Sequence, residues 1–69
     1  MRLIQIAGTP CDETGCPGVY LTEHDTVVVQ GYGLSSTDAG INLPAGELLV
    51  EIPRALLAEG ARVLGSHGQ

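Results

Sequence analysis

The sequence has no lysine, tryptophan or phenylalanine, and only three arginines stand against eight aspartates and glutamates. Its formal net charge is therefore −5 at pH 7. Proteins that bind nucleic acids need a basic face with arginine or aromatic contacts. The composition therefore predicts a protein that does not bind nucleic acid directly.

Long apolar runs are also missing. No stretch approaches the ~18 apolar residues of a membrane-spanning helix, and the apolar start of the chain is too short and interrupted for a signal peptide. We therefore expect a cytoplasmic protein without a membrane partner. With 43% hydrophobic residues, the 69-residue chain has the composition of a single small folded domain, in which we expect residues 1–2 and 65–69 to fray.

Aromatic residues are scarce, because Tyr20 and Tyr32 are the only ones. The core must therefore consist of Leu, Val, Ile and Ala. A core in so short a chain rarely supplies more than ~3–5 kcal/mol, so a covalent staple or an oligomer is often needed. The only covalent option is a bond between Cys11 and Cys16.

A β-hairpin is the clearest structural signal. Two β-rich runs flank the polar turn at residues 23–25. A three-residue turn pairs Leu21 with Val27 and Val19 with Val29, whereas a two-residue turn would place polar Gln30 opposite Val19. We therefore predict the three-residue turn.

The other elements complete an α+β fold. Residues 3–6 and 47–52 read as first and last strands, and residues 35–46 as a polar loop. Pro53 opens a helix over Arg54–Leu64. The order predicts a small antiparallel sheet (β-ββ-β) with this C-terminal helix packed on one face. The inner positions are then Val19, Leu21, Val27, Val29, Leu48, Val50 and Ile52 on the sheet, and Leu57, Ala61 and Leu64 on the helix.

Two glycines follow the second strand of the hairpin at alternate positions. Gly31 and Gly33 indicate a bulge or the close approach of another backbone. They do not form a dinucleotide-binding motif, because no helix follows to receive a phosphate.

The sheet face opposite the helix is unusually apolar for an exposed face. Glu47 and Glu51 flank it, and an apolar patch that contains tyrosine and is rimmed by charge is typical of a partner interface. The alternative is that loop 35–46 folds back over the patch. We predict a partner interface anchored by the two tyrosines, formed by Tyr20, Val28, Gln30, Tyr32, Leu34 and Leu49.

The cysteines allow three interpretations. They are ordinary reduced thiols, they form a disulfide, or they bind zinc together with two histidines, the set then being Cys11, Cys16, His24 and His67. This spacing matches no compact zinc motif, so we expect no cofactor and keep zinc as the alternative. His24 reads as a solvated turn residue.

Catalytic residues are not evident. Ser66 and His67 are adjacent, but neighbours in a tail do not form a nucleophile and base. No carboxylate pair flanks an evident cleft. We therefore predict that the protein is not an enzyme.

Four stretches of the chain carry a resemblance to known proteins: residues 16–20, 28–32, 43–47 and 50–57. Through them, residues 16–59 resemble small actinobacterial proteins encoded beside helix-turn-helix regulators. The layout is also similar, more distantly, to the BldB and WhiJ-associated partner proteins. Those carry Arg-Asp-Ser after the central strand and a tryptophan near the last helix, where this chain has Gln30-Gly31-Tyr32 and Pro53-Arg54-Ala55. The resemblance implies a regulatory or antitoxin-like partner without catalytic residues.

The expected function is that of an acidic protein-binding module. Its partner would be a DNA-binding regulator or a toxin with a basic surface, a second copy of the chain, or both. The alternative is a zinc- or disulfide-stapled stand-alone domain centred on Cys11 and Cys16. A third possibility is a subunit of an enzyme whose active site lies in another chain.

Overall fold

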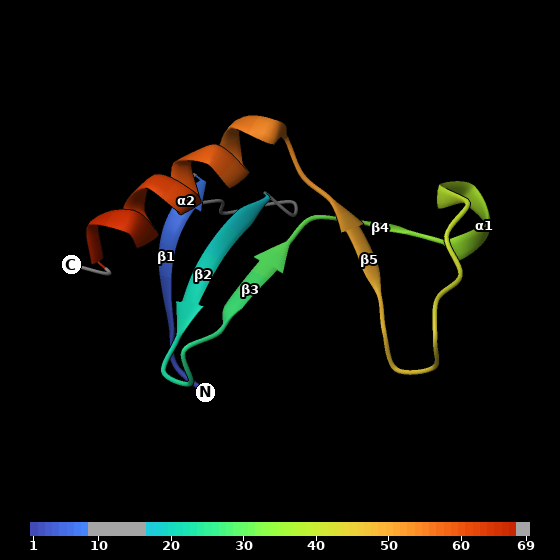
Figure 1. The fold of residues 1–69 in the computed structure, drawn as a ribbon, viewed down its shortest axis with the longest axis horizontal. Coiled ribbons are helices and arrows are strands. Elements are labelled where there is room, and N and C mark those ends of the chain that lie inside the picture. The colour runs from blue at the N-terminus through green and yellow to red at the C-terminus, as the bar shows by residue number, and fades with distance from the viewer. Residues whose placement is uncertain (9–16, 68–69) are drawn as a thin grey trace.

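A computed structural model of the chain describes residues 1–8 and 17–67, with side chains up to Ser66. The strands within these residues form two antiparallel sheets, ordered β1-β2-β3 and β4-β5, and the longer helix is C-terminal. The predicted α+β class is therefore confirmed. The elements in Figure 1 are β1 (Leu3–Gly8), β2 (Gly18–Thr22), β3 (Val27–Gln30), β4 (Tyr32–Leu34), α1 (Ser36–Ala39), β5 (Leu49–Glu51) and α2 (Arg54–His67).

The β2–β3 hairpin has the predicted register. Leu21 pairs with Val27 and Val19 pairs with Val29. The N–H of Thr22 donates to the carbonyl of Thr26 at 3.0 Å, which closes a three-residue turn. Asp25 occupies the left-handed region at φ 63°, which aspartate tolerates better than most residues.

The core lies between α2 and the first two strands. Helix α2 packs across β1 and β2. Figure 1 shows β3 on the far side of β2 from β1, away from the strands that α2 crosses. The strand register shifts between Gln5 and Ala7, and both Ile6 and Ala7 are buried next to Val19. The side chains packed partly against these three residues are Leu21, Ile52, Leu56, Val63 and Leu64.

The inner face of α2 differs from the prediction. Leu57 is 61% exposed and Ala61 is also exposed, so only Leu64 of the predicted set packs inward. The buried stripe runs instead through Leu56, Gly60, Val63 and Leu64. A count of large apolar side chains misses this stripe because a glycine stands at its centre.

Gly60 lets α2 approach β2 closely. A Cβ atom at this position would lie 3.4 Å from Cγ1 of Val19 and 3.7 Å from Cδ1 of Ile6, which leaves space for about one methyl group.

The helix begins at Arg54, and the Leu56 N–H donates to the Pro53 carbonyl at 3.0 Å.

The C-terminal boundary of α2 also differs from the prediction. The helix continues through His67, so it passes the expected end at Leu64 and includes residues expected to fray.

Strands β4 and β5 leave the main sheet at Gly31. A Cβ atom there would overlap the carbonyl oxygen of Glu51, so the close backbone approach predicted for this position is confirmed. No such contact exists at Gly33. The last strand, β5, pairs with β4 in a separate two-stranded ribbon. The prediction that Leu48 and Val50 lie under the helix is therefore wrong, because these side chains are 89% and 42% exposed.

The helix-facing side of β3 is also left open. Val27 and Val29 lie on the same sheet face as the core residues of β2, as predicted. They are nevertheless 43% and 37% exposed, because α2 packs mainly against β1 and β2.

Candidate functional site

The chain exposes more surface than a compact domain of its size. Its accessible surface is 5403 Å², whereas about 4,100 Å² is expected for a compact protein of 7.1 kDa. Its Cα radius of gyration is 13.2 Å, against about 11 Å for a compact chain of 69 residues. The β4–β5 ribbon contributes to this excess, because it projects from the body, as Figure 1 shows.

We call residues 32–51 the arm; they comprise β4, α1, β5 and the segments between them. At the outer end of the arm, the Ser35 hydroxyl accepts a hydrogen bond from the Asp38 N–H at 3.0 Å and so caps α1. Gly40, at φ 70°, ends this helix. The predicted polar loop thus contains one helical turn, and it does not fold back over Tyr32, which remains 63% exposed.

The six predicted interface residues are divided between the two sheets. Tyr32 lies opposite Glu51 and Leu34 opposite Leu49, so these residues share one face of the ribbon. The remaining three, Tyr20, Val28 and Gln30, share the face of the three-stranded sheet that points away from α2.

The two tyrosines have different environments. The Tyr20 hydroxyl donates to Oε1 of Gln30 at 3.0 Å, and the Tyr20 side chain is half-buried. Tyr32 is exposed and stands beside the exposed Glu51 on the neighbouring strand. Tyr32 is therefore the more exposed of the two tyrosines, and among the described residues no hydrogen bond of its hydroxyl is recorded.

The arm combines exposed apolar side chains with charge of one sign. Asp38, Glu47 and Glu51 are all exposed, and residues 32–51 include no basic residue. Exposed apolar residues occur along the same segment, although the strand alternation had placed two of them in the core. They are Tyr32, Ile41, Leu48 and Val50.

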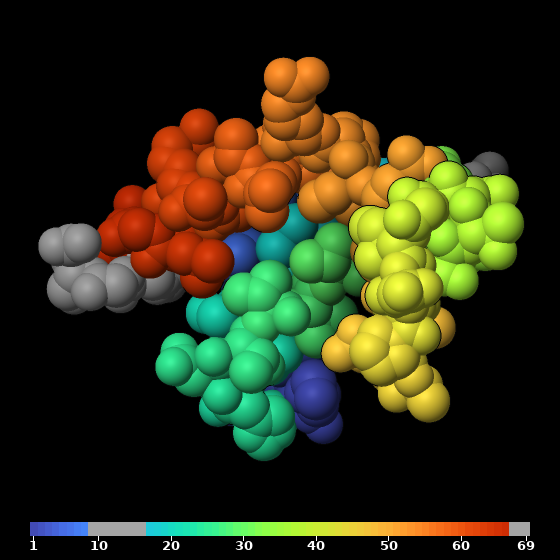
Figure 2. Space-filling model, turned by 45° about the vertical axis from the view of Figure 1, so that its right-hand side comes forward, coloured from blue at the N-terminus to red at the C-terminus, as the bar shows by residue number. Residues whose placement is uncertain are grey.

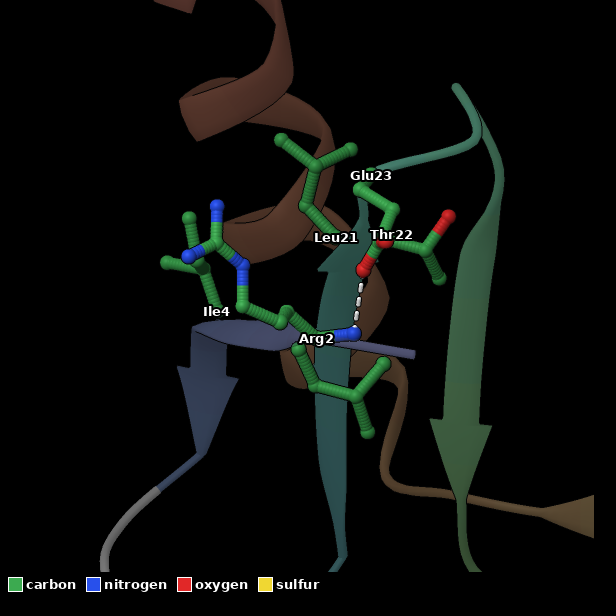
Figure 3. Close-up of a pocket in the computed structure, with 6 residues that line it drawn as sticks. Arg2, Ile4, Leu21, Thr22 and Glu23 are labelled. Atoms are coloured by element: carbon green, nitrogen blue, oxygen red, sulfur yellow. Dashed lines mark hydrogen bonds between the residues drawn. The ribbon is translucent and has the colours of Figure 1, made fainter.

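A shallow hollow lies at the other end of the molecule, beside the hairpin turn. Figure 3 shows Ile4 and Leu21 beside it, and the Arg2 N–H donates to Oε1 of Glu23 at its border. This bond joins the N-terminal segment to the end of β2. The hollow contains no nucleophile placed beside a base, so its chemistry is that of an apolar surface with a polar margin.

The predicted metal and thiol residues lie largely outside the described part of the chain. Cys11 and Cys16 are not among the described residues, and neither is the side chain of His67. His24 is exposed in the hairpin turn, where its N–H donates to the Thr22 hydroxyl at 3.0 Å. Within residues 1–8 and 17–66, no three His, Cys, Asp or Glu side chains gather in a metal-binding arrangement.

No protein-family model, curated protein or solved structure is significantly similar to this chain.

Among the described helices, none has the length and apolarity to cross a bilayer.

Proposed function

We propose that the protein is a cytoplasmic, non-enzymatic binding module whose acidic arm docks onto a basic surface of a partner protein. The observation that carries this proposal is the exposure of Tyr32 beside Glu51 on a projecting segment with three carboxylates and no base. Tyrosine is enriched among the residues that dominate binding energy, because it offers a large apolar area with a hydroxyl that tolerates water.

The charge of the arm supports a basic partner. Like-signed carboxylates on a projecting segment steer a positively charged surface toward it, which raises the association rate more than the affinity. Salt screens exposed charges over ~8 Å at physiological ionic strength. Association should therefore slow as salt is added, while the contacts of Tyr32 persist.

The kind of partner is proposed from the resemblance of residues 16–59 to proteins encoded beside helix-turn-helix regulators. A DNA-binding regulator and a toxin that acts on nucleic acid both present basic surfaces. In this proposal the module is a regulatory or antitoxin-like partner that occupies such a surface.

Affinity capture with matched variants tests the proposal. Wild type, Tyr32→Ala and Leu57→Ala are immobilised, and proteins retained from native lysate are quantified by mass spectrometry. Leu57 is the control because it is exposed to a similar extent, 61% against 63%, but lies on α2. We expect wild type and Leu57→Ala to retain the same basic protein. Tyr32→Ala should retain at least tenfold less of it. Equal retention by all three variants would contradict the role of the arm.

A further inference from the structure

Within the described residues, the outer edge of β3 lacks the features that protect edge strands. Among the described residues β3 pairs with β2 alone, so its other side presents unpaired backbone groups. Natural edges are protected by lysine, proline, a bulge or a covering element. The four residues from Val27 to Gln30 include no charge and no proline, their register with β2 is regular, and Val27 and Val29 remain 43% and 37% exposed. Figure 2 shows the surface of β3, in green, between α2 and the arm.

We propose that this edge pairs antiparallel with the same edge of a second copy of the chain. The dimer has a two-fold axis at Val28 and one sheet that runs through both copies. This inference concerns a different surface from the arm and does not depend on the proposed function.

Charge favours a second copy over a basic partner at this edge. The strands β1, β2 and β3 carry no charged residue, although the chain as a whole has a net charge of −5. Asp25 stands three positions from the axis, so the two copies of this residue would lie about 20 Å apart at ~3.3 Å per residue. That is more than two screening lengths of ~8 Å at physiological salt. The paired residues 27–30 themselves bring no like charges together, and they offer a basic surface no charge to bind. The nearest acidic residues lie at the ends of the pairing, where Asp25 of one copy stands opposite Gly31 of the other, beside Glu51.

The side chains also match in this register. An axis at Val28 places Val27 of each copy opposite Val29 of the other, on the side that faces α2. These are the valines that α2 leaves 43% and 37% exposed. On the opposite side, Gln30 would lie opposite Thr26, so a polar residue meets a polar one. Pairing thus covers the exposed valines of both copies.

Sedimentation with charge-swapped variants tests the pairing. We expect wild type to sediment as a dimer of about 14 kDa, twice the chain mass of 7.1 kDa, at micromolar concentration. Val29→Lys and Val27→Glu should each raise the dimer dissociation constant at least tenfold. Mixing the two should restore a heterodimer, because the proposed register sets the introduced lysine of one chain opposite the introduced glutamate of the other. Leu57→Lys is the control and should remain a dimer.

Three outcomes would overturn the inference: a wild-type monomer at high micromolar concentration, an undisturbed Val29→Lys dimer, or no heterodimer on mixing. Hydrogen exchange of wild type gives a readout that needs no folded variant. Amide protection of residues 27–30 should rise with protein concentration, and a concentration-independent pattern would contradict the pairing. Tyr32→Ala should leave the dimer intact, so failure of the arm proposal and failure of this inference are distinguishable.

Discussion

Replacing Gly60 with alanine should stabilise the protein. The glycine sits in the middle of α2, where it costs about 1 kcal/mol of helix stability relative to alanine. The added Cβ would lie 3.4 Å from Cγ1 of Val19 and 3.7 Å from Cδ1 of Ile6, which are contact distances and not overlaps. The methyl group therefore fits, and most of the propensity gain should appear as folding free energy.

The expected gain is about 0.5–1 kcal/mol, equivalent to roughly 2–8 °C in melting temperature for a domain of this size. Urea unfolding followed by circular dichroism measures it, at one fixed protein concentration because association adds to apparent stability. Gly60→Leu is the matched control, and overpacking should make it less stable than wild type by ~1–3 kcal/mol. A loss of more than ~1 kcal/mol in Gly60→Ala would show that the helix lies closer to the sheet than described, and would refute this reasoning.

Three further predictions concern the ribbon junction, the arm and the thiols. Gly31→Ala should destabilise the fold by about 1–3 kcal/mol in urea titrations, since its Cβ would overlap a backbone oxygen, whereas Gly33→Ala, with nothing within 4 Å, should be neutral. Tyr32→Ala should change the unfolding free energy by less than ~0.5 kcal/mol; a change like that of Gly31→Ala would place Tyr32 in the core. Replacing Cys11 and Cys16 with serine should cost little stability, and a chelator should change nothing in a melting curve. Stoichiometric zinc in elemental analysis, or unfolding by the chelator, would instead favour the metal-stapled alternative.

Local rules predicted the parts of the fold that depend on a few neighbouring residues. The hairpin register followed from turn length and from matching Val19 with Val29, and the structure has that register. The glycines at alternate positions 31 and 33 left a bulge or a close backbone approach open, and the structure shows the close approach at Gly31 alone. Each depends on contacts that the sequence pattern itself defines.

The division into two sheets could not be predicted in this way. Alternation shows that Leu48 and Val50 share a face, but it does not show which sheet their strand joins. The chain leaves the main sheet at Gly31, and that departure moves both residues from the predicted core to the surface. The inner face of α2 was misplaced because Gly60, which has no side chain to signal burial, occupies its centre.

The candidate site was predicted only in part, because alternation shows which residues share a face but not which sheet their strand joins. Tyr32, Leu34 and Leu49 share a ribbon face, as expected from alternation. Tyr20 shares its sheet face with Val28, but that face belongs to another sheet. Two exposed residues of the arm that the interface prediction missed, Leu48 and Val50, are residues that it had assigned to the core.

Nuclear magnetic resonance mapping of the bound partner tests the central claim most directly. The isotope-labelled protein is titrated with the basic protein retained in the affinity capture, and amide signals are followed residue by residue. The account predicts that shifts and broadening concentrate in residues 32–51, with Tyr32 and Glu51 among the strongest, and that the outer face of α2 around Leu57 is unchanged. Perturbations centred on α2, with the arm unaffected, would contradict it.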